Sequence, residues 1–177
     1  MISRRNFLKA AAGTAAILVA PAALAKPADP AERVLRLRNL HTGESLKATY
    51  WAEGQYIQEE LAAIDRVLRD HRADEITQMD RRLYDLLHTL QQQVSSNETF
   101  HVISGYRSPA TNAKLHKNSN GVAKRSLHMQ GRAIDIRLPG VELKHLRQAA
   151  LSLKSGGVGY YPNSNFIHVD TGRTRFW

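Results

Sequence analysis

Apolar and polar residues alternate along two neighbouring stretches early in the chain, residues 33–39 and 44–51. Alternation with a period of two is typical of strands that bury one face, and the short LHTG segment between the stretches predicts a hairpin. Two later stretches, residues 56–72 and 79–94, instead repeat apolar residues at intervals of three and four. This spacing places the apolar side chains on one side of a helix, so both stretches are predicted to be amphipathic helices.

The second half of the chain changes character, with shorter elements separated by turns. The pattern predicts strands at residues 100–108 and 132–138, helices at 109–117 and 141–154, and two short strands within 156–172. Pro109 suits the first turn of its helix, since a proline needs no partner for a backbone N–H there. The mixed order of strands and helices indicates an α+β fold, for which we expect a small antiparallel sheet packed with helices.

The first 25 residues carry the features of an export signal. Arg4 and Arg5 precede an apolar, alanine-rich run, and the segment ends in an Ala-Leu-Ala cleavage pattern. The arginine pair resembles the twin-arginine type, which exports folded proteins. The apolar run is shorter than the ~20 residues of a spanning helix, which disfavours the alternative of a membrane anchor. We therefore divide the chain into a twin-arginine-type signal at 1–25, a linker at 26–32 and a single domain at 33–177.

Composition restricts the chemistry that this domain can perform. The sequence has no cysteine, so it has no disulfides, and any metal must be held by His, Asp or Glu. The formal net charge is +9, which suits an anionic partner such as a cell-wall polymer, lipid headgroups or nucleic acid. The basic residues are scattered along the sequence, so a plain solvated surface explains them equally well.

His128 and Asp135 are two potential metal ligands placed around a glycine. Ligands of one ion must come within a few ångström of each other. Seven residues would separate them by roughly 23 Å in a strand and by about 10 Å in a helix. The chain must therefore double back between them, and Gly131 is the residue that permits such a turn.

A third ligand is expected on a second strand. In AIDIRL, Asp135 lies on the side opposite Ile134 and Ile136, and in FIHVD, His168 and Asp170 lie on the side opposite the apolar residues. If the two strands pair, Asp135 and His168 meet on one sheet face. Two histidines and one carboxylate with an open position form the pattern of a catalytic zinc site. Iron(II) in a facial triad is the main competing metal, and a loop histidine with a hydrogen-bonded strand aspartate is the structural alternative.

The same residues resemble a known signature. Ser126-x-His128-x-x-Gly131-x-Ala133-x-Asp135 matches the SxHxxGxAxD motif of the LAS-type zinc peptidases, which include D-Ala-D-Ala carboxypeptidases and the hedgehog signalling domain. The segments 104–141 and 156–172 resemble the murein endopeptidase K-like branch nearly throughout. The resemblance covers roughly residues 100–177, the motif-bearing core, and is weaker over 33–94.

The resemblance implies a catalytic domain that binds Zn²⁺ through His128, Asp135 and His168. Zinc lowers the pKa of its bound water to about 7, and a general base must then accept the water's proton. In the LAS group that base often lies three residues before the last ligand, where this chain has Asn165, an amide that cannot accept the proton. We expect Asp170 to replace it, with a role in orienting His168 or capping a turn as the alternative.

A second catalytic residue is expected at Arg107. It resembles the family arginine that faces the substrate, where it can hold a peptide carboxylate or the developing oxyanion. The alternative is a surface salt bridge.

The implied function is a periplasmic, zinc-dependent peptidoglycan hydrolase that cleaves the peptide cross-links of murein. An endopeptidase is favoured, with D,D links and L,D links between diaminopimelates both open. A D-Ala carboxypeptidase and a non-catalytic zinc-containing wall-binding module are the alternatives, and Asn165 favours the binding module. The expected partners are peptidoglycan peptide stems. We expect no nucleic-acid partner and no stable membrane insertion after signal cleavage. The sequence does not indicate an oligomeric state.

Overall fold

A computed structural model describes residues 31–119 and 121–177 of the protein. The predicted signal and nearly all of the predicted linker lie outside these residues. Eight strands form one sheet in the order β3-β2-β1-β4-β5-β7-β6-β8. Their bounds are β1 Glu32–Asn39, β2 Ser45–Ala52, β3 Gln55–Tyr56, β4 Phe100–Ser104, β5 Ala133–Arg137, β6 Gly157–Tyr161, β7 Phe166–Asp170 and β8 Arg175–Phe176.

The predicted α+β class is confirmed, but the expectation of a small, antiparallel sheet is wrong. The sheet is mixed, because β1 pairs in parallel with β4 and β6 pairs in parallel with β8. The parallel pair of β1 and β4 arises because the chain between them forms a hairpin and two helices before it returns. A crossover of this kind produces no alternating sequence pattern that would predict which strands pair. The β1–β2 hairpin does have such a pattern, and its prediction is confirmed.

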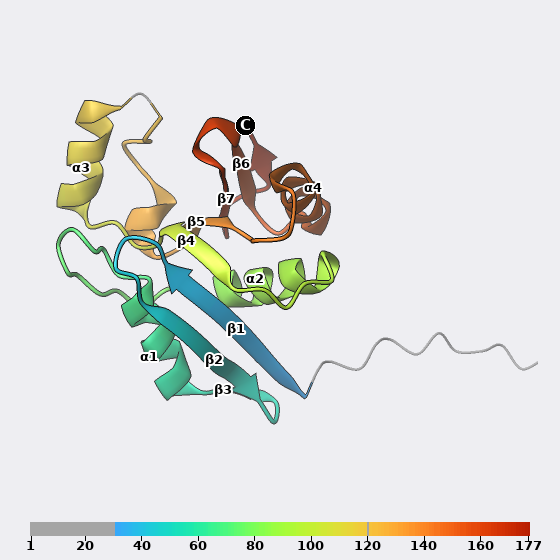
Figure 1. The fold of residues 1–177 in the computed structure, drawn as a ribbon. Coiled ribbons are helices and arrows are strands. Elements are labelled where there is room, and N and C mark those ends of the chain that lie inside the picture. The colour runs from blue at the N-terminus through green and yellow to red at the C-terminus, as the bar shows by residue number, and fades with distance from the viewer. Residues whose placement is uncertain (1–30, 120) are drawn as a thin grey trace, which may run out of the picture.

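Helices cover one face of the sheet. Four α-helices occur among the described residues, α1 Gln58–Val67, α2 Arg81–Gln93, α3 Pro109–Asn118 and α4 Leu143–Leu153. Apolar residues of α1, α2 and α4 join those of the strands in one buried core, and α2 and α4 lie side by side (Figure 1). Helix α3 contributes no residue to this core and lies apart from the other helices, beyond the end of β4.

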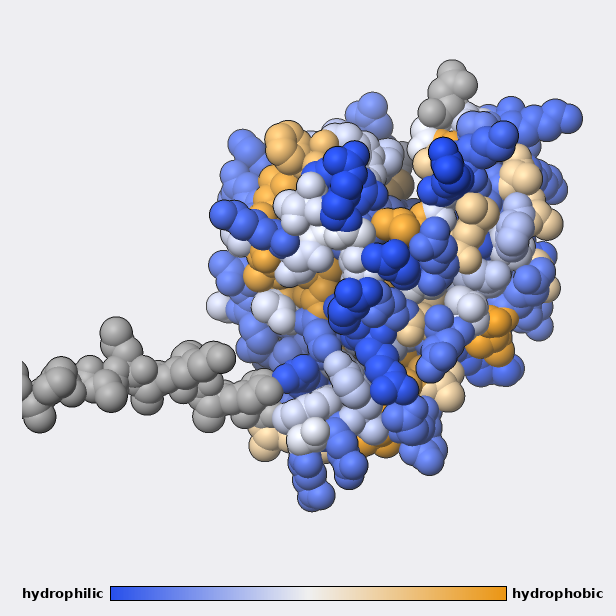
Figure 2. Space-filling view, turned by 180° about the vertical axis from the view of Figure 1, so that it is seen from behind, coloured by the Kyte–Doolittle hydropathy of each residue, from blue (hydrophilic) through white to orange (hydrophobic). Residues whose placement is uncertain are grey.

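The predicted helices form, and α1, α2 and α4 are shorter than the pattern suggests. Helix α1 ends at Val67, because Asp70 bonds to Glu75 as an isolated β-bridge and its carboxylate accepts the backbone N–H of Ser108. No helix within the described residues is long and apolar enough to cross a membrane. On the face drawn in Figure 2, hydrophobic residues form separate patches among mostly hydrophilic ones.

The turn expected at Gly131 is present and positions the functional residues. Gly131 follows a short 3-10 helix, η1 Leu127–Gln130, in a left-handed conformation with φ of 63°. A Cβ atom there would lie 2.9 Å from the Gln78 carbonyl oxygen, so both the backbone angle and the close approach favour glycine. The turn leads directly from His128 into β5, which carries Asp135.

Candidate metal centre

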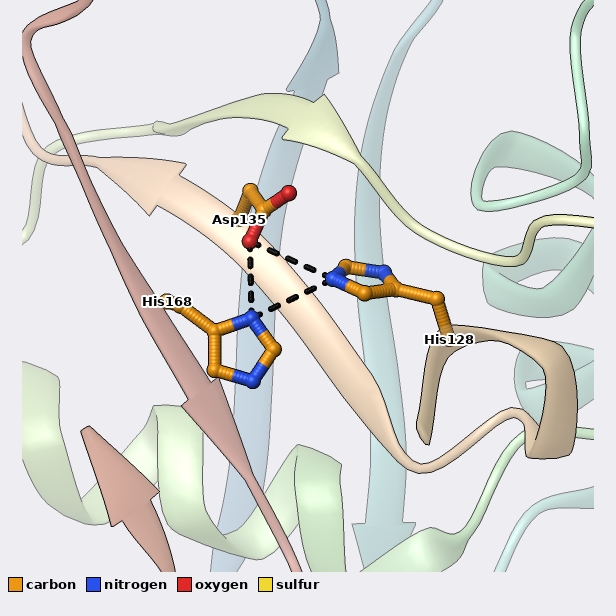
Figure 3. A group of neighbouring side chains, drawn as sticks. All are labelled: His128, Asp135 and His168. Carbon is orange, nitrogen blue, oxygen red and sulfur yellow. Dashed lines mark hydrogen bonds and ion pairs between the residues drawn. The ribbon is translucent and has the colours of Figure 1, made fainter. Parts of the chain in front are cut away.

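His128, Asp135 and His168 converge on one point, as Figure 3 shows. His128 Nε2 lies 3.2 Å from His168 Nδ1 and 3.3 Å from Asp135 Oδ1, and His168 Nδ1 lies 2.9 Å from Asp135 Oδ1. All three residues are buried, with 2%, 4% and 8% of the surface of His128, Asp135 and His168 exposed. The three residues named from the sequence are therefore brought together in the structure.

Strand pairing brings two of the three side chains together. β5 and β7 are antiparallel neighbours in which Asp135 is the direct partner of His168, as the alternation of the two strands predicted. Both faces of β5 are buried, so the site face is also covered. Its cover includes η1, which presents His128 to the two strands.

Hydrogen bonds outside the cluster determine which nitrogen of each histidine faces the centre. The Nδ1 atom of His128 lies 2.6 Å from the Gly105 carbonyl oxygen, which can only accept, so Nδ1 carries the proton and Nε2 is free. The Nε2 atom of His168 lies 2.9 Å from Asp170 Oδ2, which assigns the proton to Nε2 and leaves Nδ1 free. Both free nitrogens face Asp135.

This donor set fits a tetrahedral metal ion. Four ligands at about 2.0–2.1 Å from a zinc ion lie about 3.3 Å apart, close to the separations found here. Burial alone would raise the pKa of the Asp135 carboxyl, but the neighbouring His128 and His168 rings hold that pKa well below its usual range. Burial lowers the pKa of His128, which favours the neutral form that a ligand requires. The chemistry of the residues therefore suits a divalent cation.

Asp170 lies on the far side of the His168 ring from the other two ligands. Besides His168, its carboxylate accepts hydrogen bonds from the backbone N–H groups of Gly157 and Gly172 at 3.0 and 2.8 Å. Arg175 Nη2 forms an ion pair with Oδ2 at 2.6 Å. The residue is fully buried, and these bonds keep its pKa well below the ordinary value although burial opposes them. Both oxygens are therefore occupied, and neither faces the point on which the three ligand atoms converge.

Arg107 lies at the metal centre rather than on the outer surface. Its guanidinium donates to Oδ2 of Asp135, the oxygen that does not face the histidines, and to Ser104 Oγ at 2.8 Å. It also lines a cavity of about 260 Å³ beside Asp135, together with Tyr161, Phe166 and residues of the loop after α3. This position combines contact with a ligand and access to a cavity.

Asn165, the residue at the position of the family base, occupies a tight turn. It ends η2 Pro162–Ser164 in a left-handed conformation with φ of 52° and is exposed. Asparagine adopts this conformation more readily than most residues. The left-handed turn therefore favours asparagine at position 165 on structural grounds.

Sequence reasoning missed Trp177, which packs beside His168, and Arg175, which forms an ion pair with Asp170. The Trp177 ring centroid lies 5.2 Å from that of His168, and its Nε1 donates to the Tyr161 hydroxyl at 2.8 Å. Space for the indole exists because Gly159, the strand partner of His168, has no side chain. A glycine inside a strand pattern signals such a close approach and could have been noticed.

A buried His–Asp–His group on a mixed sheet, with the SxHxxGxAxD segment supplying two of its three residues, is the arrangement expected of a LAS-type zinc peptidase. A family model described as "Peptidoglycan L,D-endopeptidase MepK" matches residues 27–177. The chain belongs to this family.

Individual proteins with similar sequences carry the same name as this family. The peptidoglycan L,D-endopeptidase MepK of Escherichia coli is 49% identical over 163 residues, which cover 92% of this chain and 89% of that protein. The probable peptidoglycan L,D-endopeptidase MepK of Haemophilus influenzae is 43% identical over 155 residues, 87% of this chain and 83% of that protein. A model of the twin-arginine translocation signal matches residues 1–21, which indicates export across the cytoplasmic membrane.

Proposed function

We infer that this protein is a periplasmic, zinc-dependent peptidoglycan endopeptidase that cleaves L,D cross-links between diaminopimelate residues. The observation that supports this most directly is the buried His128–Asp135–His168 group, in a chain whose 49% identical relative is named a peptidoglycan L,D-endopeptidase. Two histidines, one carboxylate and an adjoining cavity suit a catalytic zinc ion better than a closed structural site, which is usually rich in cysteine. We propose residues 33–177 as a single catalytic domain.

Zinc held by these three residues would supply a Lewis acid and lower the pKa of a bound water. The chain's own residues turn both histidines toward the site, since the Gly105 carbonyl and the Asp170 carboxylate each accept the proton of the outer nitrogen. We therefore propose that Asp170 is a positioning residue for His168 and not the general base predicted from its place on the strand. A base must reach the proton it accepts, and both Asp170 oxygens are already occupied by four neighbouring groups.

We propose that Arg107 holds Asp135 in place and also presents its guanidinium to a substrate carboxylate or carbonyl in the cavity. Arg107→Lys keeps the positive charge but loses the forked geometry that reaches both Ser104 and Asp135. We expect kcat/KM for cross-link cleavage to fall ~10- to 100-fold with zinc still bound. Steady-state kinetics and metal content measured on the same preparation test this. A surface salt bridge would instead leave both quantities near the wild-type values.

The function is tested with defined muropeptide dimers. Zinc-loaded protein lacking residues 1–25 should convert L,D-linked dimers to monomers, because the named relatives are L,D-endopeptidases. Mass spectrometry of the products distinguishes this from its alternatives. Release of terminal D-Ala alone would indicate a carboxypeptidase, and cleavage of D,D-linked dimers alone would contradict the L,D assignment. Binding without any cleavage by the zinc-loaded protein would indicate a wall-binding module.

A further inference from the structure

Basic side chains form a row across the sheet face that carries the metal centre. On β1, Arg36 is the strand partner of Lys47, and Arg38 is the parallel partner of His101 on β4. His101 in turn pairs with Arg137 on β5. Residues that alternate with them, such as Leu37, belong to the core on the opposite face, so these side chains point away from the helices. We call Arg36, Arg38, Lys47, His101 and Arg137 the basic face.

The charges of the basic face are not neutralised by neighbouring carboxylates. Other arginines of the sheet region form ion pairs, for example Arg33 with Asp85 at 2.8 Å and Arg69 with Glu44 at 2.7 Å. Within residues 31–119 and 121–177, the cations of the basic face form no ion pair. The one carboxylate that lines the same hollow is Glu98. Three cations therefore outnumber one acid there.

Most of the basic face lines a hollow. A depression of about 500 Å³ is lined by Arg36, Arg38, Lys47 and His101. The Nδ1 atom of His101 is buried without a hydrogen-bond partner. Burial and the charges of Arg137 and Arg38 lower the pKa of His101. Folding does not explain this arrangement, since like charges on directly opposite strand positions such as Arg36 and Lys47 are destabilising.

The basic face extends along β5 toward the candidate metal centre. Arg137 lies two residues after Asp135 on β5 and on the same face, a spacing of roughly 7 Å along a strand. A polymer bound at the metal centre can therefore reach the basic face without leaving the sheet surface. Arginine suits carboxylate ligands, because its planar donor fork matches both carboxylate oxygens.

We propose that the basic face binds free carboxylates of murein peptide stems next to the cross-link that is cleaved at the metal centre. The proposal rests on the proposed peptidoglycan substrate and adds a second contact region for the polymer. Peptide stems carry several carboxylates in a repeating array, so a row of unpaired cations complements them in charge. The basic face would thus favour intact wall over short soluble fragments.

The test compares two charge-reversed variants with the same change in net charge. Arg38→Glu/Lys47→Glu alters the basic face, and Arg66→Glu/Lys144→Glu alters residues of α1 and α4, which pack on the other face of the sheet. Zinc-loaded proteins are incubated with insoluble murein sacculi on ice, and the bound fraction is measured at low and high salt. Cleavage of sacculi and of soluble L,D-linked dimers is measured in parallel. Arg38→Gln/Lys47→Gln provides a milder variant should the reversal impair folding.

We expect Arg38→Glu/Lys47→Glu to weaken sacculus binding about 10-fold at low salt, with a smaller difference at high salt, and the control pair to retain it. The loss of cleavage on sacculi should exceed the loss on soluble dimers by a similar factor. Equal losses in both variants, or none in either, would overturn the proposal. The proposal would also be overturned if Arg38→Glu/Lys47→Glu lost binding to phosphatidylglycerol vesicles but kept its binding to sacculi. Failure of the wild-type protein to cleave dimers would instead refute the proposed function, since binding is measured independently.

Discussion

Replacing His168 with alanine is expected to abolish both metal binding and cross-link cleavage. His168 Nδ1 is one of the three atoms that converge at 2.9–3.3 Å, and two remaining ligands cannot hold a zinc ion in a catalytic site. We expect metal affinity to fall by more than ~100-fold, beyond the usual effect of losing an outer hydrogen-bond partner. Cleavage should fall by ~10³-fold or more, since the metal supplies several kcal/mol of transition-state stabilisation.

The measurement is the elemental content of the purified protein together with dimer cleavage. Wild-type protein should carry about one zinc per chain, and the element found also distinguishes zinc from iron. His145→Ala is the matched control, because His145 lies on α4 with 66% of its side chain exposed and forms only a distant contact with Glu142. Metal retained at full stoichiometry by His168→Ala would contradict the assigned ligand set.

The second large effect is expected from Asp170→Asn. The neutral amide can still accept the Nε2–H of His168, but it loses the negative charge that strengthens this bond and balances Arg175. We expect zinc affinity to fall ~10- to 100-fold, as for other residues that orient a metal-bound histidine. At saturating zinc, cleavage should return to within about 10-fold of wild type. The free energy of unfolding should fall by about 1–3 kcal/mol, because a partly buried arginine is left without its counter-ion.

Zinc titration monitored by both affinity and cleavage separates the two roles considered for Asp170. A general base would show normal affinity and a loss of ~10²-fold or more that added zinc does not restore. That outcome would return Asp170 to the role predicted from the strand pattern. Asp74→Asn serves as the control, because Asp74 is an exposed carboxylate that forms an ion pair with Arg69 away from the candidate site.

Local residue patterns were sufficient for the two strands that carry Asp135 and His168, but not for the short 3-10 helix that carries His128. Period-two alternation in FIHVD and AIDIRL correctly placed His168 and Asp135 on one face, because side chains on neighbouring antiparallel strands share a face whenever the strands are in register. The need for the chain to turn back identified Gly131, which is in the left-handed conformation. Helix spacing predicted α1 and α2, although their ends depended on contacts such as that of Asp70 with Ser108.

The placement of Asp170 shows why the pattern alone was not enough. Alternation states that Asp170 shares a face with His168, but it does not state which nitrogen of the ring each neighbour contacts. The position of Arg175 on β8, which is parallel to β6, and of two backbone N–H groups decides that the carboxylate lies behind the ring. Those partners come from segments whose pairing has no local signal, so only the tertiary structure decides where the carboxylate lies.

By itself, the sequence determined the candidate ligands, the turn between His128 and Asp135 and the strands that carry Asp135 and His168, because these depend on spacings of a few residues along one segment. The tertiary structure decided the mixed sheet, the nitrogen that each histidine presents, the attachment of Arg107 to Asp135 and the gathering of cations on one face. These features depend on which distant segments become neighbours. That choice reflects the burial of the whole core, which no single stretch of sequence contains.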